Sequence, residues 1–258
     1  MTGYAQDYSI DELFIATLAR QIQGDNRAIL AVEVPLCLIA WLLAKETHAP
    51  DCGCWTLAGG LDPKPSRLPL STGDPTLIEG ALANLDLSTK VGLARLGRYD
   101  VMFLSGVQID KFGNVNNSVI GSFDRPKVRL PGGAGGAEMI HLVPKVILYR
   151  AKHDIKTFVG KVDFVTYPGW IDTVTWRRGG PVKVITNLAI MDFDEESRQM
   201  RLKSVHPGVT VDQVVDNTGF ALIIPKRVTE TEPPTREQVD LIRNKIDPEG
   251  LRKSQIFN

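Results

Sequence analysis

The chain has 258 residues, 43% of them apolar, and its 30 basic side chains balance 30 acidic ones. This composition can bury one large core or two small ones, and the balanced charge leaves no positive field for nucleic acid or an anionic membrane, so neither is expected as a partner. The longest apolar run, 34–44, is too short for a spanning helix, residues 1–6 lack a secretory pattern, and three cysteines, an odd number, favour the reducing cytoplasm.

The first part of the chain alternates between helical and strand patterns. Ser9 and Glu12 form a capping box at the start of an amphipathic helix that we expect to end near Gly24. Pro35 can open a second helix that runs through Leu43. This alternation is typical of βαβ units and predicts an α/β protein. The remaining elements expected here are strands at 28–32, 54–57 and 100–104 and a helix at 75–85.

The second part is richer in hairpins. A turn at 110–114 joins apolar runs at 107–109 and 115–120, which predicts a hairpin. No internal repeat or linker separates independent domains, so we expect one domain over residues 1–258. The further elements expected are strands at 145–149, 162–166, 182–186, 189–193 and 199–205 and helices at 211–217 and 236–245.

The segment 131–138 is the strongest local signal for a site. Its four glycines expose backbone N–H groups and allow close approach of another molecule. It does not fit the dinucleotide-binding pattern, because Gly133 and Gly135 would require a glycine where Glu138 stands. Two interpretations remain, a flexible turn and a backbone cradle for a ligand carbonyl, phosphate or amide.

The polar turn at 108–116 allows two interpretations as well. Its residues are good turn formers, yet with the glycine-rich segment they resemble two sides of one pocket. In the segment 165–172, Trp170 is expected to pack in a corner, whereas Tyr167 could contact a ligand or a partner subunit.

No metal site is predicted. Cys52 and Cys54 have Cys-x-Cys spacing without a second cysteine pair, and His48 is the nearest imidazole, whereas zinc needs four well-placed ligands. We expect both to be buried thiols. The other three histidines fit no Ser-His-Asp spacing, and Gly-x-Ser-x-Gly is absent.

Five ordered segments together resemble the glutaconate CoA-transferase-like β-subunits of class I CoA-transferases over nearly the whole chain. The resemblance implies an α/β fold with an open, mostly parallel sheet, and a homologous α-subunit that shares the active-site cleft in an αβ or α2β2 assembly. It implies no bound cofactor, with CoA present as part of the substrate thioester. The segments are HAPDC (48–52), QIDKFGNVN (108–116), GGAGGA (132–137), VTYPGWID (165–172) and NTGF (217–220).

The resemblance also assigns candidate binding residues. In this family the glycine-rich loop lines the acyl-CoA pocket, so binding is expected at the loop and at polar residues of the preceding turn. These residues are Gly132, Gly133, Ala134, Gly135, Gly136, Gln108, Asn114 and Asn116.

Two departures from the family pattern bear on the chemistry. The family's nucleophilic glutamate precedes Ser-Gly or Asn-Gly, and here that place reads Leu57-Ala58-Gly59; the segment 33–35 also lacks an expected glycine pattern. Leucine cannot attack a thioester or carry CoA. A subgroup with this loss resembles the β-subunit of the steroid-ring-cleaving CoA hydrolase of bacterial cholesterol degradation.

That resemblance implies hydrolysis of a ring C–C bond beside a ketone, which leaves a thioester-stabilised enolate. The reaction needs a base for water and donors for the oxyanion, and the glycine loop could supply the donors. Glu33 and Glu138 are the candidate bases on this chain, and an α-subunit glutamate is a third. The alternatives are a CoA-transferase for a dicarboxylic or keto acid, with its carboxylate elsewhere, and a non-catalytic structural subunit.

Overall fold

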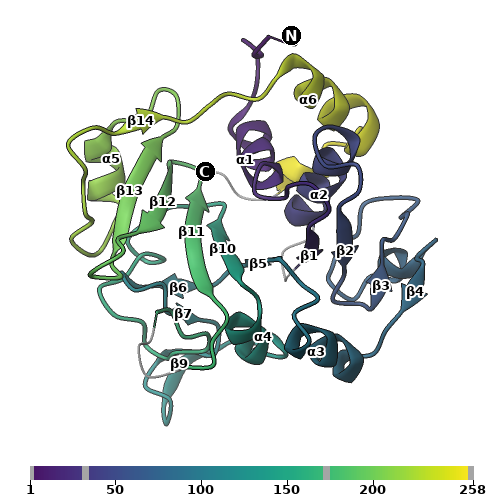
Figure 1. Cartoon of the computed structure of the whole chain (residues 1–258). Helices are drawn as coiled ribbons and strands as arrows, with labels where there is room; N and C mark the ends of the chain where they lie inside the picture. Colours follow the sequence, from purple (N-terminus) through teal and green to yellow (C-terminus); the bar gives the residue numbers. More distant parts are fainter. Residues whose placement is uncertain (1–2, 31–34, 171–174, 255–258) are drawn as a thin grey trace. The chain divides into compact units, whose positions relative to one another are not determined.

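The computed structural model describes residues 3–30, 35–170 and 175–254. The chain divides into two compact units, which we call the first unit (residues 1–104 and 232–258) and the second unit (residues 105–231) (Figure 1). The single domain expected over residues 1–258 stays a prediction.

The first unit contains a mixed sheet. Its strands follow the order β5-β1-β2-β3-β4, with β1 parallel to both β5 and β2, and with β3 antiparallel to both β2 and β4. Parallel strands in the middle of a βαβ arrangement are what the sequence alternation predicts. The bounds are β1 (Arg27–Ile29), β2 (Gly53–Trp55), β3 (Gly60–Leu61), β4 (Ala83–Asn84) and β5 (Val101–Leu104).

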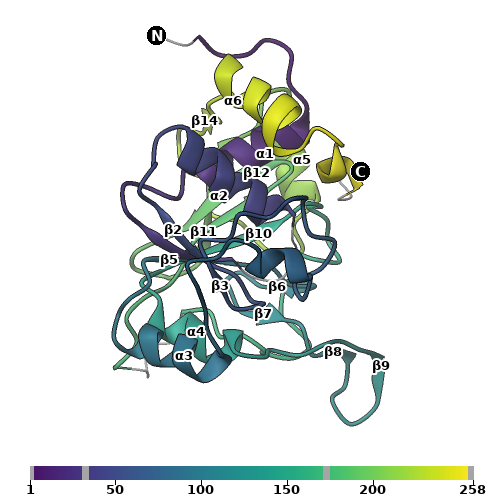
Figure 2. The same cartoon turned by 90° about the vertical axis from the view of Figure 1, so that its right-hand side faces the viewer.

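Helices α1, α2 and α6 of the first unit lie together, whereas α3 lies apart from them on the other side of the strands (Figures 1 and 2). The capping box of α1 is confirmed, because the Ser9 N–H donates to Glu12 Oε2 at 2.9 Å. Helix α2 begins directly after Pro35 and buries Trp41. The bounds are α1 (Ile10–Ala19), α2 (Leu36–Glu46), α3 (Leu87–Arg95) and α6 (Arg236–Leu241), followed by helical turns at Ile242–Ile246 and Leu251–Ser254.

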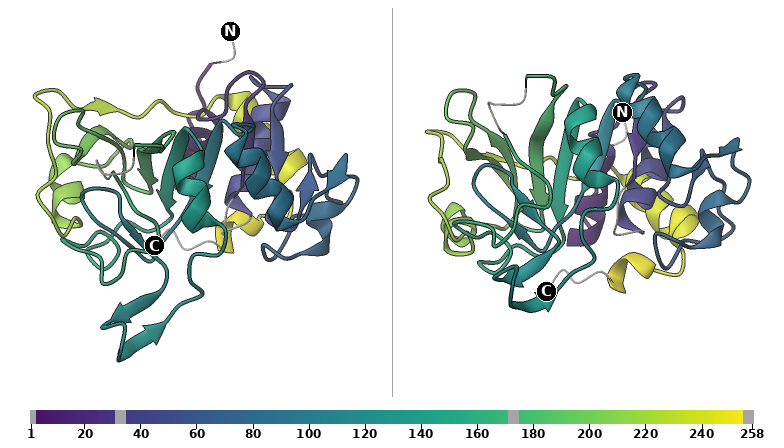
Figure 3. Two further views of the ribbon diagram at one scale, coloured as in Figure 1. Left: turned by 60° about the horizontal axis from the view of Figure 1, so that its bottom comes forward. Right: turned by 90° about the horizontal axis from the view of Figure 1, so that it is seen from below.

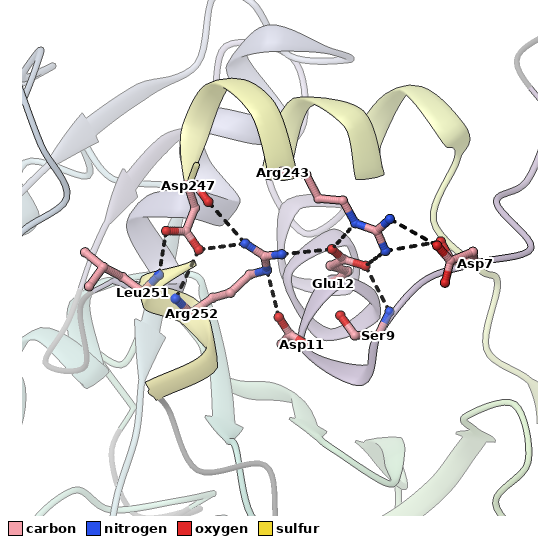
Figure 4. A network of polar contacts seen from close by, with 8 residues as sticks. All are labelled: Asp7, Ser9, Asp11, Glu12, Arg243, Asp247, Leu251 and Arg252. Atoms are coloured by element: carbon pink, nitrogen blue, oxygen red, sulfur yellow. Dashed lines mark hydrogen bonds and ion pairs between the residues drawn. The ribbon is translucent and has the colours of Figure 1, made fainter. Parts of the chain in front are cut away.

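The C-terminal turns are attached to α1 by a buried ion-pair network (Figure 4). The guanidinium of Arg252 contacts Asp11 at 2.7 Å, Glu12 at 3.0 Å and Asp247 at 2.9 Å, and the Arg252 side chain is 5% exposed. Arg243 adds a second contact to Glu12 at 2.7 Å. Because both arginines bind the start of α1, the two ends of the chain are joined in one unit.

The second unit contains a sheet of order β14-β13-β12-β11-β10 and two separate hairpins. Strand β10 is parallel to β11, β12 is antiparallel to both of its neighbours, and β14 is parallel to β13. The β8–β9 hairpin extends from its unit as an arm (Figures 2 and 3). The bounds are β6 (Gln108–Ile109), β7 (Val115–Asn116), β8 (Val119–Gly121), β9 (Pro126–Arg129), α4 (Gly136–Leu142), β10 (Lys145–Arg150), β11 (Gly180–Thr186), β12 (Ala189–Phe193), β13 (Met200–Val205), α5 (Val211–Asp216) and β14 (Thr229–Glu230).

Several expected elements differ in the structure. The helix expected at 75–85 is a single turn, Pro75–Ile78, because Gly80 has a φ of +59° and the chain then enters β4. The strand expected at 162–166 is absent as a strand from the described residues, because the Asp163 N–H donates to the Gln108 side chain rather than to a neighbouring strand. Strand β2 ends at Trp55, two residues earlier than expected. Part of the expected strand at 28–32 and residues 171–174 lie outside the described residues.

Two helices were missed by the sequence prediction. Helix α3 has little apolar periodicity, although the Asp86 carboxylate caps it by accepting from the Thr89 N–H at 2.7 Å. Helix α4 begins inside the glycine-rich segment, where the high glycine content favoured a loop. Among the described residues, no helix has the length and apolar character needed to cross a bilayer.

Candidate functional site

The glycine-rich segment of the second unit leads from β9 into α4. Gly132 and Ala134 have positive φ values of +87° and +41°, so the chain reverses sharply there. Gly136 faces the ring of Tyr167, and a Cβ added at Gly136 would lie 2.8 Å from Tyr167 Cε1. Glycine at 136 is therefore required by the close approach of this aromatic ring.

Hydrogen bonds attach this loop to the β6–β7 hairpin. The Gly132 N–H donates to the Asn117 carbonyl at 2.8 Å, and the Asn117 N–H donates to the Thr166 hydroxyl at 2.8 Å. The Tyr167 hydroxyl donates to the Gly133 carbonyl at 3.3 Å, while the Tyr167 N–H donates to the Val115 carbonyl. The structure thus brings three of the sequence segments together: the polar hairpin, the glycine loop and residues 166–167.

Tyr167 and Trp170 serve as packing residues within this unit. The Tyr167 side chain is buried, and burial raises the pKa of its phenol. Trp170 donates from its indole N–H to the Pro181 carbonyl at 2.8 Å, which agrees with the packed corner expected there. A ligand or partner contact of Tyr167 stays a prediction.

The hairpin side chains chosen as candidate ligand contacts are hydrogen-bonded within the protein. Asn116 is fully buried and donates to Gln108 Oε1 at 2.7 Å, and Gln108 Nε2 donates to Asp163 at 3.2 Å. Asn114 donates to Asp110 at 2.9 Å and accepts from the Gly169 N–H at 2.8 Å. These contacts hold the turn in shape, and a binding role for Gln108, Asn114 and Asn116 stays a prediction.

The glycine loop retains free donors. Within the described parts of the chain, the N–H groups of Gly133, Ala134 and Gly135 have no hydrogen-bond acceptor. Groups of this kind can bind an anionic oxygen. The binding role predicted for Gly132, Gly133, Ala134, Gly135 and Gly136 stays a prediction with this geometry behind it.

The two candidate bases have different standing in the structure. Glu138 lies in the first turn of α4, half-exposed and next to the glycine loop. Glu33 lies outside the described residues. The catalytic roles of both stay predictions.

In the first unit, the tight turn 56–60 carries the residue expected at the nucleophile position. Leu57 lies at the tip of this turn with its side chain 39% exposed. The Gly59 N–H donates to the Thr56 carbonyl at 3.2 Å, and the Gly60 N–H donates to the Thr56 hydroxyl at 3.0 Å. A Cβ on Gly59 would lie 2.2 Å from Asn84 Oδ1 and one on Gly60 would lie 2.1 Å from the Leu77 carbonyl oxygen, so the turn is closely packed from behind.

A lysine that the sequence prediction missed contacts this turn. Lys90, on α3, is 7% exposed and donates from Nζ to the Leu57 carbonyl at 2.8 Å and to the Thr56 carbonyl at 3.5 Å. Burial lowers the pKa of its ammonium group. The residue was missed because α3 was missed, and only the Asp86–Thr89 cap in the sequence could have revealed that helix.

The cysteines and two of the histidines have structural environments. Cys37, Cys52 and Cys54 are buried free thiols, and burial raises the pKa of Cys52 to about 11. The described residues contain no group of three or more side chains arranged to hold a metal ion. His153 and His206 are buried and hydrogen-bonded to threonines of the second unit.

The sequence matches a known family. The description of coenzyme A transferases matches residues 12–217. The 3-oxoadipate CoA-transferase of Pseudomonas knackmussii has a B-type subunit that is 38% identical over 249 residues, which cover 92% of each chain. The cholesterol ring-cleaving hydrolase IpdB subunit of Mycobacterium bovis is 32% identical over 222 residues, which cover 83% of this chain and 85% of that one.

Solved structures share the fold. The decarboxylase AibA/AibB aligns with a TM-score of 0.89 at 28% identity over 98% of this chain and 100% of that chain. Glutaconate coenzyme A-transferase from Acidaminococcus fermentans gives 0.85 at 32% identity, over 95% and 97%. IpdAB of Rhodococcus jostii gives 0.83 at 25% identity, over 97% and 99%.

These matches, with the fold described above, define an α/β protein of the CoA-transferase type. The chain belongs to the coenzyme A transferase family and is of the β-subunit class, as its sequence motifs predicted. The α/β fold class is likewise confirmed.

Proposed function

We propose that this chain is the β-subunit of a heteromeric hydrolase that opens a ring of a β-keto acyl-CoA thioester in late steroid degradation. Water adds to the ring ketone, and the adjacent C–C bond breaks with its electron pair moving to the carbon beside the thioester. A proton then neutralises this enolate, and the product is a carboxylic acid that still carries its CoA thioester.

The observation that carries the proposal is Leu57 at the tip of the 56–60 turn. An aliphatic side chain that is 39% exposed can line a pocket for an acyl group, but it cannot form an acyl anhydride or a CoA thioester. Ring hydrolysis needs no such carrier, because CoA stays on the same molecule throughout. The chemistry therefore fits a chain that has lost its nucleophile.

The relatives support chemistry other than transfer on this scaffold. IpdAB is a cholesterol ring-cleaving hydrolase by name, and AibA/AibB is a decarboxylase. Both names describe cleavage reactions rather than transfer of CoA. We also infer a homologous α-subunit as partner, because AibA/AibB and IpdAB are both complexes of two subunits.

The test uses the purified complex of this chain with its α-subunit and a cyclic β-keto acyl-CoA in ¹⁸O-labelled water. We expect one ¹⁸O atom in the new carboxylate and no hydroxylamine-sensitive thioester on this chain. Detection of CoA bound to this chain, or transfer of CoA to a second acid without ring opening, would overturn the proposal.

The second candidate is a CoA-transferase for a dicarboxylic or keto acid. The observation that favours it is the 38% identity to the 3-oxoadipate CoA-transferase relative over 92% of the chain. In that case the attacking carboxylate must come from a residue other than Leu57. The same labelling experiment decides between the two, because a transferase places no oxygen from water in its product.

A further inference from the structure

The contacts of Lys90 determine the direction of two peptide groups in the 56–60 turn. In a trans peptide the C=O and the N–H point in opposite directions. The Thr56 carbonyl shares its peptide plane with the Leu57 N–H, and the Leu57 carbonyl shares its plane with the Ala58 N–H. Because Lys90 Nζ binds both carbonyls, at 3.5 and 2.8 Å, both N–H groups point away from the lysine.

These two N–H groups are available to a ligand. Neither the Leu57 N–H nor the Ala58 N–H has an acceptor in the part of the chain that the structure describes. Leu57 is exposed and Ala58 is half-exposed, so the tip of the turn is open. The turn is held from behind by the Thr56 hydroxyl and by the packing at Gly59 and Gly60, which keeps the two donors in a fixed position.

The charge of Lys90 strengthens the pair of donors. An ammonium group hydrogen-bonded to a carbonyl polarises the peptide and makes its N–H a better donor. Among the described residues, no carboxylate lies within ion-pair distance of Lys90, so its charge is not cancelled by a direct partner. The ammonium therefore acts on the turn itself.

Leucine at position 57 suits this arrangement. Short and medium-length carboxylates can hydrogen-bond to neighbouring backbone N–H groups and would compete for these two donors. The Leu57 side chain carries no acceptor, so the donors stay free.

We propose that the Leu57 and Ala58 N–H groups form an oxyanion hole, held in place by Lys90, for the carbonyl oxygen of the acyl-CoA substrate on which negative charge develops. This inference rests on the proposed function insofar as it assumes an acyl-CoA substrate. Lys90 is a positioning residue, since it acts through the two peptide groups. Removal of one donor from such a site costs about 10²- to 10³-fold in kcat.

The test compares Lys90→Met, Lys90→Arg and the control Lys64→Met, a change at an exposed lysine of the same unit. In each complex with the α-subunit, kcat and KM are measured, and the carbonyl stretch of a bound, unreactive acyl-CoA labelled with ¹³C at the carbonyl is recorded by infrared difference spectroscopy. We expect Lys90→Met to lower kcat by about 10²-fold with little change in KM and to lose the shift to lower wavenumber. Lys90→Arg should recover part of both, and Lys64→Met should match the wild type.

A second measurement uses the wild-type complex alone. Binding of the same unreactive acyl-CoA should slow hydrogen exchange at the Leu57 and Ala58 amides. Unchanged exchange at both amides, or an unshifted carbonyl stretch in the wild type, would overturn the oxyanion hole. If protection and the shift are present while a cyclic β-keto thioester is not opened, the oxyanion hole stands and the proposed hydrolase function fails.

Discussion

At the scale of single residues, the tip of the 56–60 turn combines an exposed aliphatic side chain with two free backbone donors and a buried lysine behind them. The chemistry at this point depends on the absence of a carboxylate at position 57. That absence can be reversed by one substitution.

We expect Leu57→Glu to form a hydroxylamine-sensitive CoA thioester on this chain when the complex is incubated with an acyl-CoA, because the turn would then present an attacking carboxylate. Ring opening should fall at least about 10-fold, since the new side chain competes for the two donors. Leu57→Gln has the same size without a nucleophile and should form no thioester. Mass spectrometry of this subunit after trapping measures the outcome, and an absence of adduct in Leu57→Glu would contradict the position assigned to the nucleophile.

At the scale of elements, the glycine loop and α4 are shaped by Tyr167. The ring lies where a Cβ of residue 136 would be, so the loop can follow its observed path only with glycine there. The same contact attaches the loop to the β6–β7 hairpin.

Gly136→Ala should destabilise the protein by about 1–3 kcal/mol, because the added methyl group forces the ring or the helix to move. The matched control is Gly92→Ala in α3, where a Cβ would meet nothing within 4 Å. That change should stabilise the protein by about 0.5–1 kcal/mol through helix propensity. Urea unfolding of both variants gives the two free energies, and equal effects would contradict the packing described for Tyr167.

The ion-pair network of Figure 4 holds the last helical turns against α1. We expect Arg252→Met to destabilise the first unit by about 3–5 kcal/mol, because it leaves the buried carboxylates of Asp11, Glu12 and Asp247 without their cation. Arg243→Met should cost less, since the Arg243 side chain is 38% exposed. Proteolysis at the C-terminal end and urea unfolding report the loss, and a larger effect of Arg243→Met would reverse this ranking.

At the scale of the whole molecule, stability depends on pH through two buried histidines. Burial lowers the pKa of His153 and of His206 from 6.5 to about 4. Nε2 of His206 donates to the Thr186 carbonyl at 2.7 Å, which the neutral ring satisfies without a charge. The folded protein therefore keeps both rings neutral at pH values where the unfolded chain is protonated.

The sign follows from proton binding. Between about pH 6.5 and pH 4 the unfolded chain binds more protons than the folded protein, so the free energy of unfolding falls as the pH decreases. The slope reaches at most about 1.4 kcal/mol per pH unit for each histidine. Urea unfolding at pH 7 and pH 5 measures it, with His206→Asn expected to reduce the slope and the exposed His48→Gln to leave it unchanged. A slope that is the same in His206→Asn would contradict this assignment.

The sequence by itself determined the α/β class, the family, the capped helix α1, the β6–β7 hairpin and the absence of a carboxylate at position 57, because these depend on local periodicity, turn chemistry and residue identity. Only the tertiary structure decided that Gln108, Asn114 and Asn116 are hydrogen-bonded within the protein, that Tyr167 requires Gly136, and that Lys90 reaches back to the 56–60 turn. Lys90 is 33 residues from Leu57 along the chain. No local pattern encodes a contact of that separation, because it exists only once the chain has folded α3 back onto this turn.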